Sequence, residues 1–214
     1  MEIVAGLVDI VLRLDVHLGA LVHDYGAWVY AILFAVIFAE TGLVVTPFLP
    51  GDSLLFVAGA LAALGGLDVH LLVAALSAAA VLGNTANYAI GRWLGRRIFD
   101  GGGSRWLKRE HLERTRAFYE RYGGAAVVIS RFLPIIRTYV PFVAGLARMG
   151  QGRFTLFNVA GAVLWVGSLA YAGFFFGNLP WVRANLTAII LAIIALSLVP
   201  VAVAAWKARG PARP

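Results

Sequence analysis

Four ionisable side chains stand within apolar stretches of this 214-residue chain: Glu40, Asp52, Arg131 and Arg137. A charged side chain at the centre of a bilayer costs on the order of 3 kcal/mol on insertion scales, so each one needs a specific reason. The sequence contains no Asp or Glu after Glu120, and neither arginine can therefore pair with a carboxylate from the C-terminal part of the chain. Within the apolar stretches, the available carboxylates are those of Glu40 and Asp52.

This charged group has two interpretations. In the first, the four side chains form a static network of ion pairs that holds segments of the chain together. In the second, Arg131 and Arg137 bind an anionic group near the bilayer midplane, and Glu40 and Asp52 take up and release protons as it moves. A guanidinium donates two parallel hydrogen bonds to a phosphate, and a low-dielectric surrounding favours the protonated form of a carboxylate. The two interpretations are compatible if an ion pair opens when the anion arrives.

The composition excludes an ordinary soluble fold. Hydrophobic residues make up 61% of the chain and charged residues 14%, whereas soluble domains are about half apolar and a quarter charged. A net charge of +7 would indicate nucleic acid only on a soluble fold with a basic face. Here the basic residues flank apolar runs, which predicts membrane lipids rather than nucleic acid as partners. The chain has no cysteine and four scattered histidines, so neither a metal site nor another cofactor is expected.

Two segments are expected to form re-entrant helical hairpins, 26–66 and 123–147. Each contains apolar runs shorter than the ~20 residues that a straight crossing needs. The breaks between the runs contain prolines, a glycine and charges: Pro47, Pro50, Gly51 and Asp52 in the first hairpin, and Arg131, Pro134, Arg137 and Pro141 in the second. Irregular backbone at membrane depth persists only inside protein or beside a wet cavity. We therefore expect Pro50, Gly51 and Pro134 to line the site.

Three longer apolar segments are expected to cross the bilayer, at 71–90, 154–177 and 184–206. The first contains Asn84 and Asn87, which suit hydrogen bonding between helices and are also candidates for lining the site. Residues 1–24 place their charges on one helical face and are expected to form an interfacial or peripheral helix. The prediction is one all-α polytopic membrane domain over residues 1–214.

The distribution of basic residues predicts the topology. Segment 92–121 contains nine Lys and Arg, and the first 91 residues contain one, Arg13. By the positive-inside rule, this segment and the C-terminus lie in the cytoplasm. The two hairpins then enter from opposite sides.

A short internal repeat agrees with that topology. Phe-Leu-Pro at 48–50 is followed by Phe-Val-Ala-Gly at 56–59, and the same two words recur at 132–134 and 142–145. Hairpins of opposite entry would form an inverted repeat that meets near the midplane, as in many secondary transporters.

These features together resemble the DedA family, the bacterial branch of membrane proteins with the SNARE-associated or VTT domain. The resemblance covers roughly residues 26–180. The residues that carry it are Glu40, Pro47-Phe48-Leu49-Pro50-Gly51-Asp52, Gly83-Asn84, Tyr88, Gly91, Arg131-Phe132-Leu133-Pro134, Arg137, Ala144-Gly145, Asn158, Gly161, Trp165, Tyr171, Gly173 and Gly177. A departure is Asn84, where many members carry an acid.

The resemblance implies a lipid transporter of the cytoplasmic membrane that moves undecaprenyl phosphate or a related polyprenyl phosphate, linked to the proton gradient. It assigns the functionally required charges to Glu40, Asp52, Arg131 and Arg137. The alternatives are a general phospholipid flippase or scramblase, and an envelope scaffold that does not transport. An enzyme is not expected, because lipid-phosphate phosphatases generally use histidine, which the intramembrane segments almost lack. The sequence leaves the lipid, the coupling ion, the direction of transport and the oligomeric state open, a homo-oligomer included.

Overall fold

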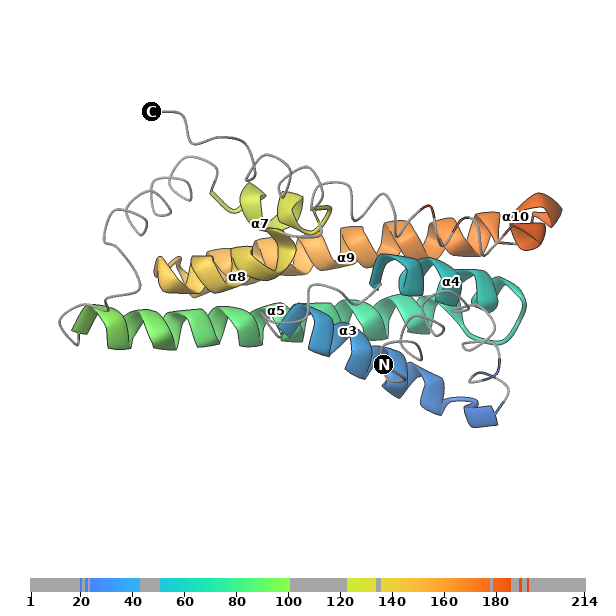
Figure 1. The fold of residues 1–214 in the computed structure, drawn as a ribbon, viewed down its shortest axis with the longest axis horizontal. Coiled ribbons are helices and arrows are strands. Elements are labelled where there is room, and N and C mark those ends of the chain that lie inside the picture. Colours follow the sequence, from blue (N-terminus) through green and yellow to red (C-terminus); the bar gives the residue numbers. More distant parts are fainter. Residues whose placement is uncertain are drawn as a thin grey trace, which may run out of the picture. The chain divides into compact units, whose positions relative to one another are not determined.

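The computed structural model describes residues 20, 22, 24–42, 51–100, 123–133, 136–177, 179–185, 189 and 192. Within this part of the chain the regular secondary structure is helical throughout (Figure 1), which confirms the predicted all-α class. The helices follow in the order α3 (Trp28–Gly42), α4 (Gly51–Ala63), α5 (Val69–Asp100), α7 (Ala125–Ser130), α8 (Ile136–Leu146), α9 (Gln151–Phe176) and α10 (Pro180–Ala184).

Helix length separates two classes of element. In α5 and α9, the segments Val69–Gly95 and Gln151–Phe176 are long and apolar enough to cross a membrane by length and composition. At ~1.5 Å per residue, 26 residues of α9 extend about 39 Å, more than the ~30 Å apolar thickness of a bilayer. Helices α3 and α4, with 15 and 13 residues, are too short for a straight crossing.

Helix α5 extends at its C-terminal end beyond the apolar segment expected to cross the bilayer. The crossing is expected over 71–90 and a cytoplasmic basic loop or helix over 92–121, and α5 continues to Asp100. Lys- and Arg-rich sequence supports a helix as well as a loop, and the first cluster of helix-breaking residues is the glycine run at 101–103. The charged character of this segment therefore begins inside the helix.

Several expected features lie outside the described residues. These are the first hairpin's turn at 43–50 with Pro47 and Pro50, Pro134 in the second hairpin, segment 101–122, nearly all of 1–24 and most of 184–206. The second hairpin is represented by α7 and α8, on either side of Arg131.

The chain divides into two compact units. The first consists of Met1–Ala31, Pro50–Leu72 and Ser168–Pro214, and the second of Ile32–Leu49 and Val73–Gly167. Helices α3, α5 and α9 each contribute residues to both units.

In the first unit, α4 packs against the C-terminal part of α9 through glycines. Gly59 of α4 faces the carbonyl oxygen of Ala170, and Gly173 of α9 faces the carbonyl oxygen of Phe56. A methyl group on either glycine would overlap the facing oxygen. The two backbones approach this closely only because both positions lack a side chain.

In the second unit, α8 packs against α5 in the same way (Figure 1). Gly145 faces the carbonyl oxygen of Tyr88, and Gly91 faces the carbonyl oxygen of Phe142, again without room for a methyl group. The contacting residues of α4 and α8 are the first and last residues of the repeated sequence Phe-Val-Ala-Gly, at 56–59 in α4 and at 142–145 in α8. The repeated words therefore occupy equivalent packing positions, one in each unit.

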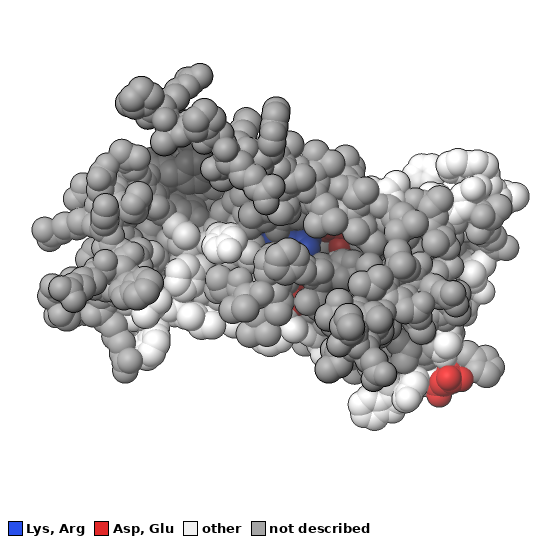
Figure 2. All heavy atoms as spheres, viewed as in Figure 1, with Lys and Arg blue, Asp and Glu red and all other residues white. Residues whose placement is uncertain are grey.

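Polarity is distributed as in a protein surrounded by lipid. Large apolar side chains are exposed, among them Trp28 at 73%, Leu156 at 67% and Phe175 at 68%, and few of the described residues on the face in Figure 2 are charged. Glu40 and several amides are instead fully buried. Extended apolar surface outside and ionisable groups inside are characteristic of a membrane protein.

Candidate functional site

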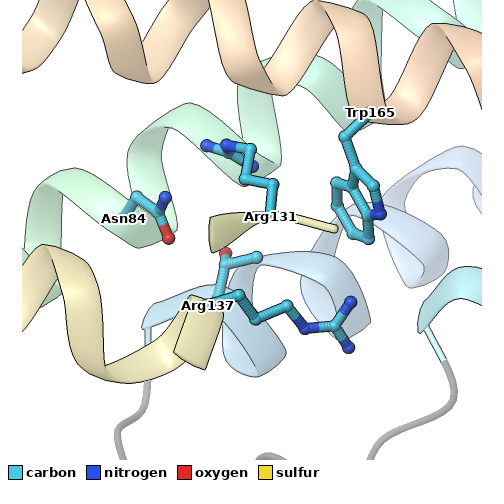
Figure 3. Close-up of a pocket in the computed structure, with 5 residues that line it drawn as sticks. Asn84, Arg131, Arg137 and Trp165 are labelled. Atoms are coloured by element: carbon cyan, nitrogen blue, oxygen red, sulfur yellow. The ribbon is translucent and has the colours of Figure 1, made fainter. Parts of the chain in front are cut away.

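A pocket in the second unit brings together polar side chains from five parts of the chain. Its lining residues are Thr41, Asn84, Arg131, Arg137 and Trp165 (Figure 3). They come from α3, α5, the residue after α7, α8 and α9, respectively. In the close-up, Trp165 extends from α9 toward both arginine side chains. Asn84 lies on the opposite side of Arg131 from Trp165.

The first element of the site is an ion pair between Arg137 and Glu40. The Arg137 side chain is 6% exposed and that of Glu40 is fully buried. Arg137 lies in the first turn of α8 and Glu40 in the last turn of α3. The helix dipole disfavours a cation at an N-terminus and an anion at a C-terminus by about 0.3–1 kcal/mol each. The stability of the individual helices therefore does not explain why Arg137 and Glu40 stand at these ends. Their ion pair between the two helices does explain it.

Arg131 is held in a different way. It follows α7 as the C-cap residue and is 3% exposed. Its Nη2 donates to Asn158 Oδ1 at 2.6 Å, with longer hydrogen bonds to the carbonyl oxygens of Ala80 (3.3 Å) and Asn158 (3.4 Å). Its buried Nε has no hydrogen-bond partner among the described residues. The acceptors of this guanidinium within the described chain are therefore all neutral oxygens.

Asn158 connects Arg131 to α5. It is fully buried on α9, and its Nδ2 donates to the Val81 carbonyl oxygen at 3.0 Å and to Thr85 Oγ1 at 3.3 Å. Its Oδ1 accepts from Asn84 Nδ2 at 3.2 Å as well as from Arg131. Because both ends of the amide have partners of the correct kind, this network defines which end faces the arginine.

Close packing at Gly161 supports the contact between Arg131 and α9. A Cβ atom on Gly161, one turn after Asn158, would lie 3.1 Å from Arg131 Cδ and 3.2 Å from Val128 Cα. The Arg131 stem therefore lies against a surface of α9 that only glycine leaves open.

The other predicted amide, Asn87, serves the packing around the site. It is fully buried and donates to the carbonyl oxygens of Thr138 at 2.7 Å and Thr41 at 3.4 Å. It thereby joins α5 to both α8 and α3. Asn84 lines the pocket and Asn87 links the helices that form it.

Trp165 contacts both guanidinium groups. The residue is 2% exposed, and the Cζ atoms of Arg131 and Arg137 lie 6.0 and 5.3 Å from its ring centroid. These distances permit cation–π attraction, which reaches about 2 kcal/mol when the groups are desolvated. In the sequence, Trp165 is identified only by the family resemblance, and nothing there indicates its contact with the two arginines.

Asp52 belongs to the first unit, whereas the residues that line the pocket belong to the second. It is the second residue of α4, where the helix dipole favours a carboxylate, and the adjacent Gly51 is buried. Three of the four predicted charges therefore lie in one unit. Pro50 and Pro134 lie outside the described residues. Among the described residues, no cluster of His, Cys, Asp and Glu could hold a metal ion.

Sequence reasoning about charges missed the residue that holds Arg131. Asn158 contributes no charge, and its only local signal is an amide within the apolar segment 154–177. An amide in such a segment is expected to bond to a neighbouring helix, but the sequence does not identify the partner.

Comparison with known proteins places the chain in a family. Residues 49–175 match the VTT domain. The chain is 50% identical to Protein DedA of Escherichia coli K12 over 94% of its own length and 92% of that protein. It is 43% identical to an uncharacterized membrane protein of Mycobacterium leprae, over 80% and 77% of the two chains. It is 37% identical to the inner membrane protein YghB of Escherichia coli K12, over 76% and 78%. No solved structure matches the chain.

Proposed function

This chain belongs to the DedA family of membrane proteins, which carry the VTT domain, and from that membership we propose that it is a lipid flippase. Its substrate in this proposal is undecaprenyl phosphate or a related polyprenyl phosphate, and transport across the bacterial cytoplasmic membrane is linked to the proton gradient. This substrate class is the one that the family resemblance implies.

The observation that carries the proposal is a pocket with two buried guanidinium groups, in a protein whose described residues expose many large apolar side chains. A lipid phosphate has one anionic end and one apolar end, and these two environments match its two ends. Arg131 is the stronger candidate for the headgroup, because its described acceptors are neutral oxygens and leave its charge uncompensated. A desolvated arginine binds a phosphate oxygen through a charge-assisted hydrogen bond.

The proposal gives the other residues distinct roles. Arg137 pairs with Glu40, and the headgroup competes with this carboxylate for Arg137. Protonation of Glu40 would favour the exchange, which links lipid movement to the proton gradient. Asp52 is proposed as the second proton-linked carboxylate, and Pro50, Gly51 and Pro134 as lining residues.

The topological part of the proposal is a multi-pass protein with a cytoplasmic C-terminus and two oppositely entering re-entrant hairpins. Two observations support it. Helices α3 and α4 are short and apolar, and the equivalent glycine contacts of α4 with α9 and of α8 with α5 are those expected of an internal repeat.

The experiment that tests the function uses purified protein in liposomes with undecaprenyl phosphate. An added phosphatase that cannot cross the bilayer reports how much lipid reaches the outer leaflet, with and without a pH gradient. A labelled phosphatidylcholine is followed in parallel. We expect wild-type protein to accelerate movement of the polyprenyl phosphate and Arg131→Ala to abolish it. Arg153→Ala removes an exposed arginine from the first turn of α9 and serves as the matched control.

The alternatives predict different results. Equal movement of both lipids would identify a general scramblase. Absence of movement under every condition would contradict transport and favour a scaffold. Loss of folded protein in Arg131→Ala, monitored by size-exclusion chromatography, would favour the static ion-pair network.

A further inference from the structure

We propose that Asn158 is a positioning residue for the anionic headgroup: its neutral amide oxygen orients Arg131 without neutralising it. The inference deepens the proposed function and rests on it. Asn158 does not need to touch the lipid in this role, because it acts through the guanidinium that it holds.

Arg131 is held by neutral acceptors. The shortest hydrogen bond of Arg131 goes to Asn158 Oδ1, at 2.6 Å, and its other acceptors in the described chain are carbonyl oxygens. A carboxylate at this position would form a charge-assisted pair, and a phosphate would then have to displace an internal anion. A neutral oxygen fixes the direction of the guanidinium and leaves its positive charge in place.

The orientation of the Asn158 amide is fixed by its hydrogen bonds. Its Nδ2 is engaged by Val81 and Thr85 on α5, and Asn84 donates to the same Oδ1 that accepts from Arg131. Asn84 itself lines the pocket. Rotation of the Asn158 amide by half a turn would place its oxygen against the acceptor oxygens of Val81 and Thr85. It would also place its nitrogen against the donor groups of Asn84 and Arg131. The arrangement is therefore fixed before any ligand arrives.

Part of the Arg131 guanidinium has no hydrogen-bond partner among the described residues. The contacts with Asn158 and α5 all use Nη2, and the buried Nε has no partner among the described residues. Arg131 also lines the pocket, with Trp165 on one side. An unsatisfied buried donor of a charged group is costly, and a phosphate oxygen would relieve that cost.

The test compares two probes that differ only in the headgroup, farnesyl phosphate and farnesol, binding to the purified full-length protein in detergent. Asn158→Asp is nearly isosteric. In this variant we expect the affinity for farnesyl phosphate to fall about tenfold or more, which corresponds to the loss of roughly one charge-assisted hydrogen bond. Affinity for farnesol is expected to remain unchanged. General damage to the pocket would weaken both probes equally, and therefore the ratio of the two affinities is the diagnostic quantity.

Asn185→Asp provides a control for the added charge. Asn185 donates to the Trp181 carbonyl oxygen within its own turn at 2.8 Å, so the variant introduces the same carboxylate at the end of α10, in the first unit. We expect both affinities to equal those of the wild type. Asn158→Leu provides a second variant that removes the acceptor without adding charge. Its affinity ratio should fall between those of wild type and Asn158→Asp.

The outcomes separate the inference from the function on which it rests. Wild-type protein that binds farnesyl phosphate no better than farnesol would contradict both. Wild-type preference for the phosphate that persists in Asn158→Asp would overturn the positioning role alone. If Asn158→Asp does not fold, an unchanged ratio in Asn158→Leu overturns it equally, and a lowered ratio supports it.

Discussion

Glu40 and Arg137 form a buried ion pair although they lie 97 positions apart in the sequence. The pair joins the end of α3 to the start of α8, two helices that come from the two predicted hairpins. Removing one partner of a buried pair leaves an uncompensated charge and typically costs about 3–5 kcal/mol, whereas replacing both partners costs much less.

The ion pair predicts a strong coupling between its two residues. Glu40→Gln is expected to lower the unfolding midpoint in detergent clearly, and Glu40→Gln combined with Arg137→Gln to recover a substantial part of that loss. Chemical denaturation of wild type, both single variants and the double variant measures this coupling. Additive effects of the two substitutions would show that the pair contributes nothing beyond its separate residues.

Trp165 predicts a graded effect on headgroup binding. Trp165→Phe keeps an aromatic face beside both guanidinium groups, so we expect affinity for farnesyl phosphate to stay within a few-fold of wild type. Trp165→Leu removes the face and is expected to lower affinity about fivefold, which corresponds to a cation–π contribution of ~1 kcal/mol. Calorimetric titration measures both, with farnesol as the uncharged reference. Equal affinities of the Phe and Leu variants would assign Trp165 to packing alone.

The glycine contacts predict matched losses of stability in the two units. Gly91→Ala and Gly173→Ala each place a methyl group against a carbonyl oxygen, of Phe142 and Phe56 respectively. Overpacking of this kind costs roughly 1–3 kcal/mol, and both variants should unfold at lower temperature in a thermal-shift measurement.

Gly167→Ala is the control for this pair. A Cβ atom there meets nothing within 4 Å, and alanine stabilises a helix relative to glycine by up to about 1 kcal/mol. Its unfolding temperature should equal or exceed that of wild type. Unfolding temperatures for Gly91→Ala and Gly173→Ala that match this control would mean that the close approaches do not constrain the packing.

The proposed topology predicts opposite labelling of two single cysteines, introduced into a chain that has none of its own. Leu64 is 54% exposed in the turn before α5, and Ser104 lies beyond the end of α5 in the basic segment. If α5 crosses the membrane with positive residues inside, Leu64→Cys should react with an impermeant maleimide in intact cells. Ser104→Cys should react only after the cells are opened. Reaction of both cysteines in intact cells would refute the predicted orientation.

The sequence predicted the helical class and singled out the two arginines that line the pocket, but not how their charges are held. Insertion cost and the absence of acids after Glu120 identify Arg131 and Arg137 without any structure. The acceptor of Arg131 depends instead on how α7, α5 and α9 pack together. Asn158 is 27 positions away in the sequence, and no periodicity links the two. The end of α5 at Asp100 was also beyond sequence reasoning, because a basic segment is compatible with both loop and helix.

The two glycine contacts differ in when they can form during synthesis. In the second unit, Gly91 meets Phe142 on a helix that leaves the ribosome before α9 is made. In the first unit, Phe56 of α4 meets Gly173 near the end of α9, so α4 must wait until nearly the whole chain has been inserted. Long-range contacts of this kind form late and leave their partners exposed in the meantime. Helix α4 is therefore expected to reach its final packing later than α8 and to need protection by the insertion machinery for longer.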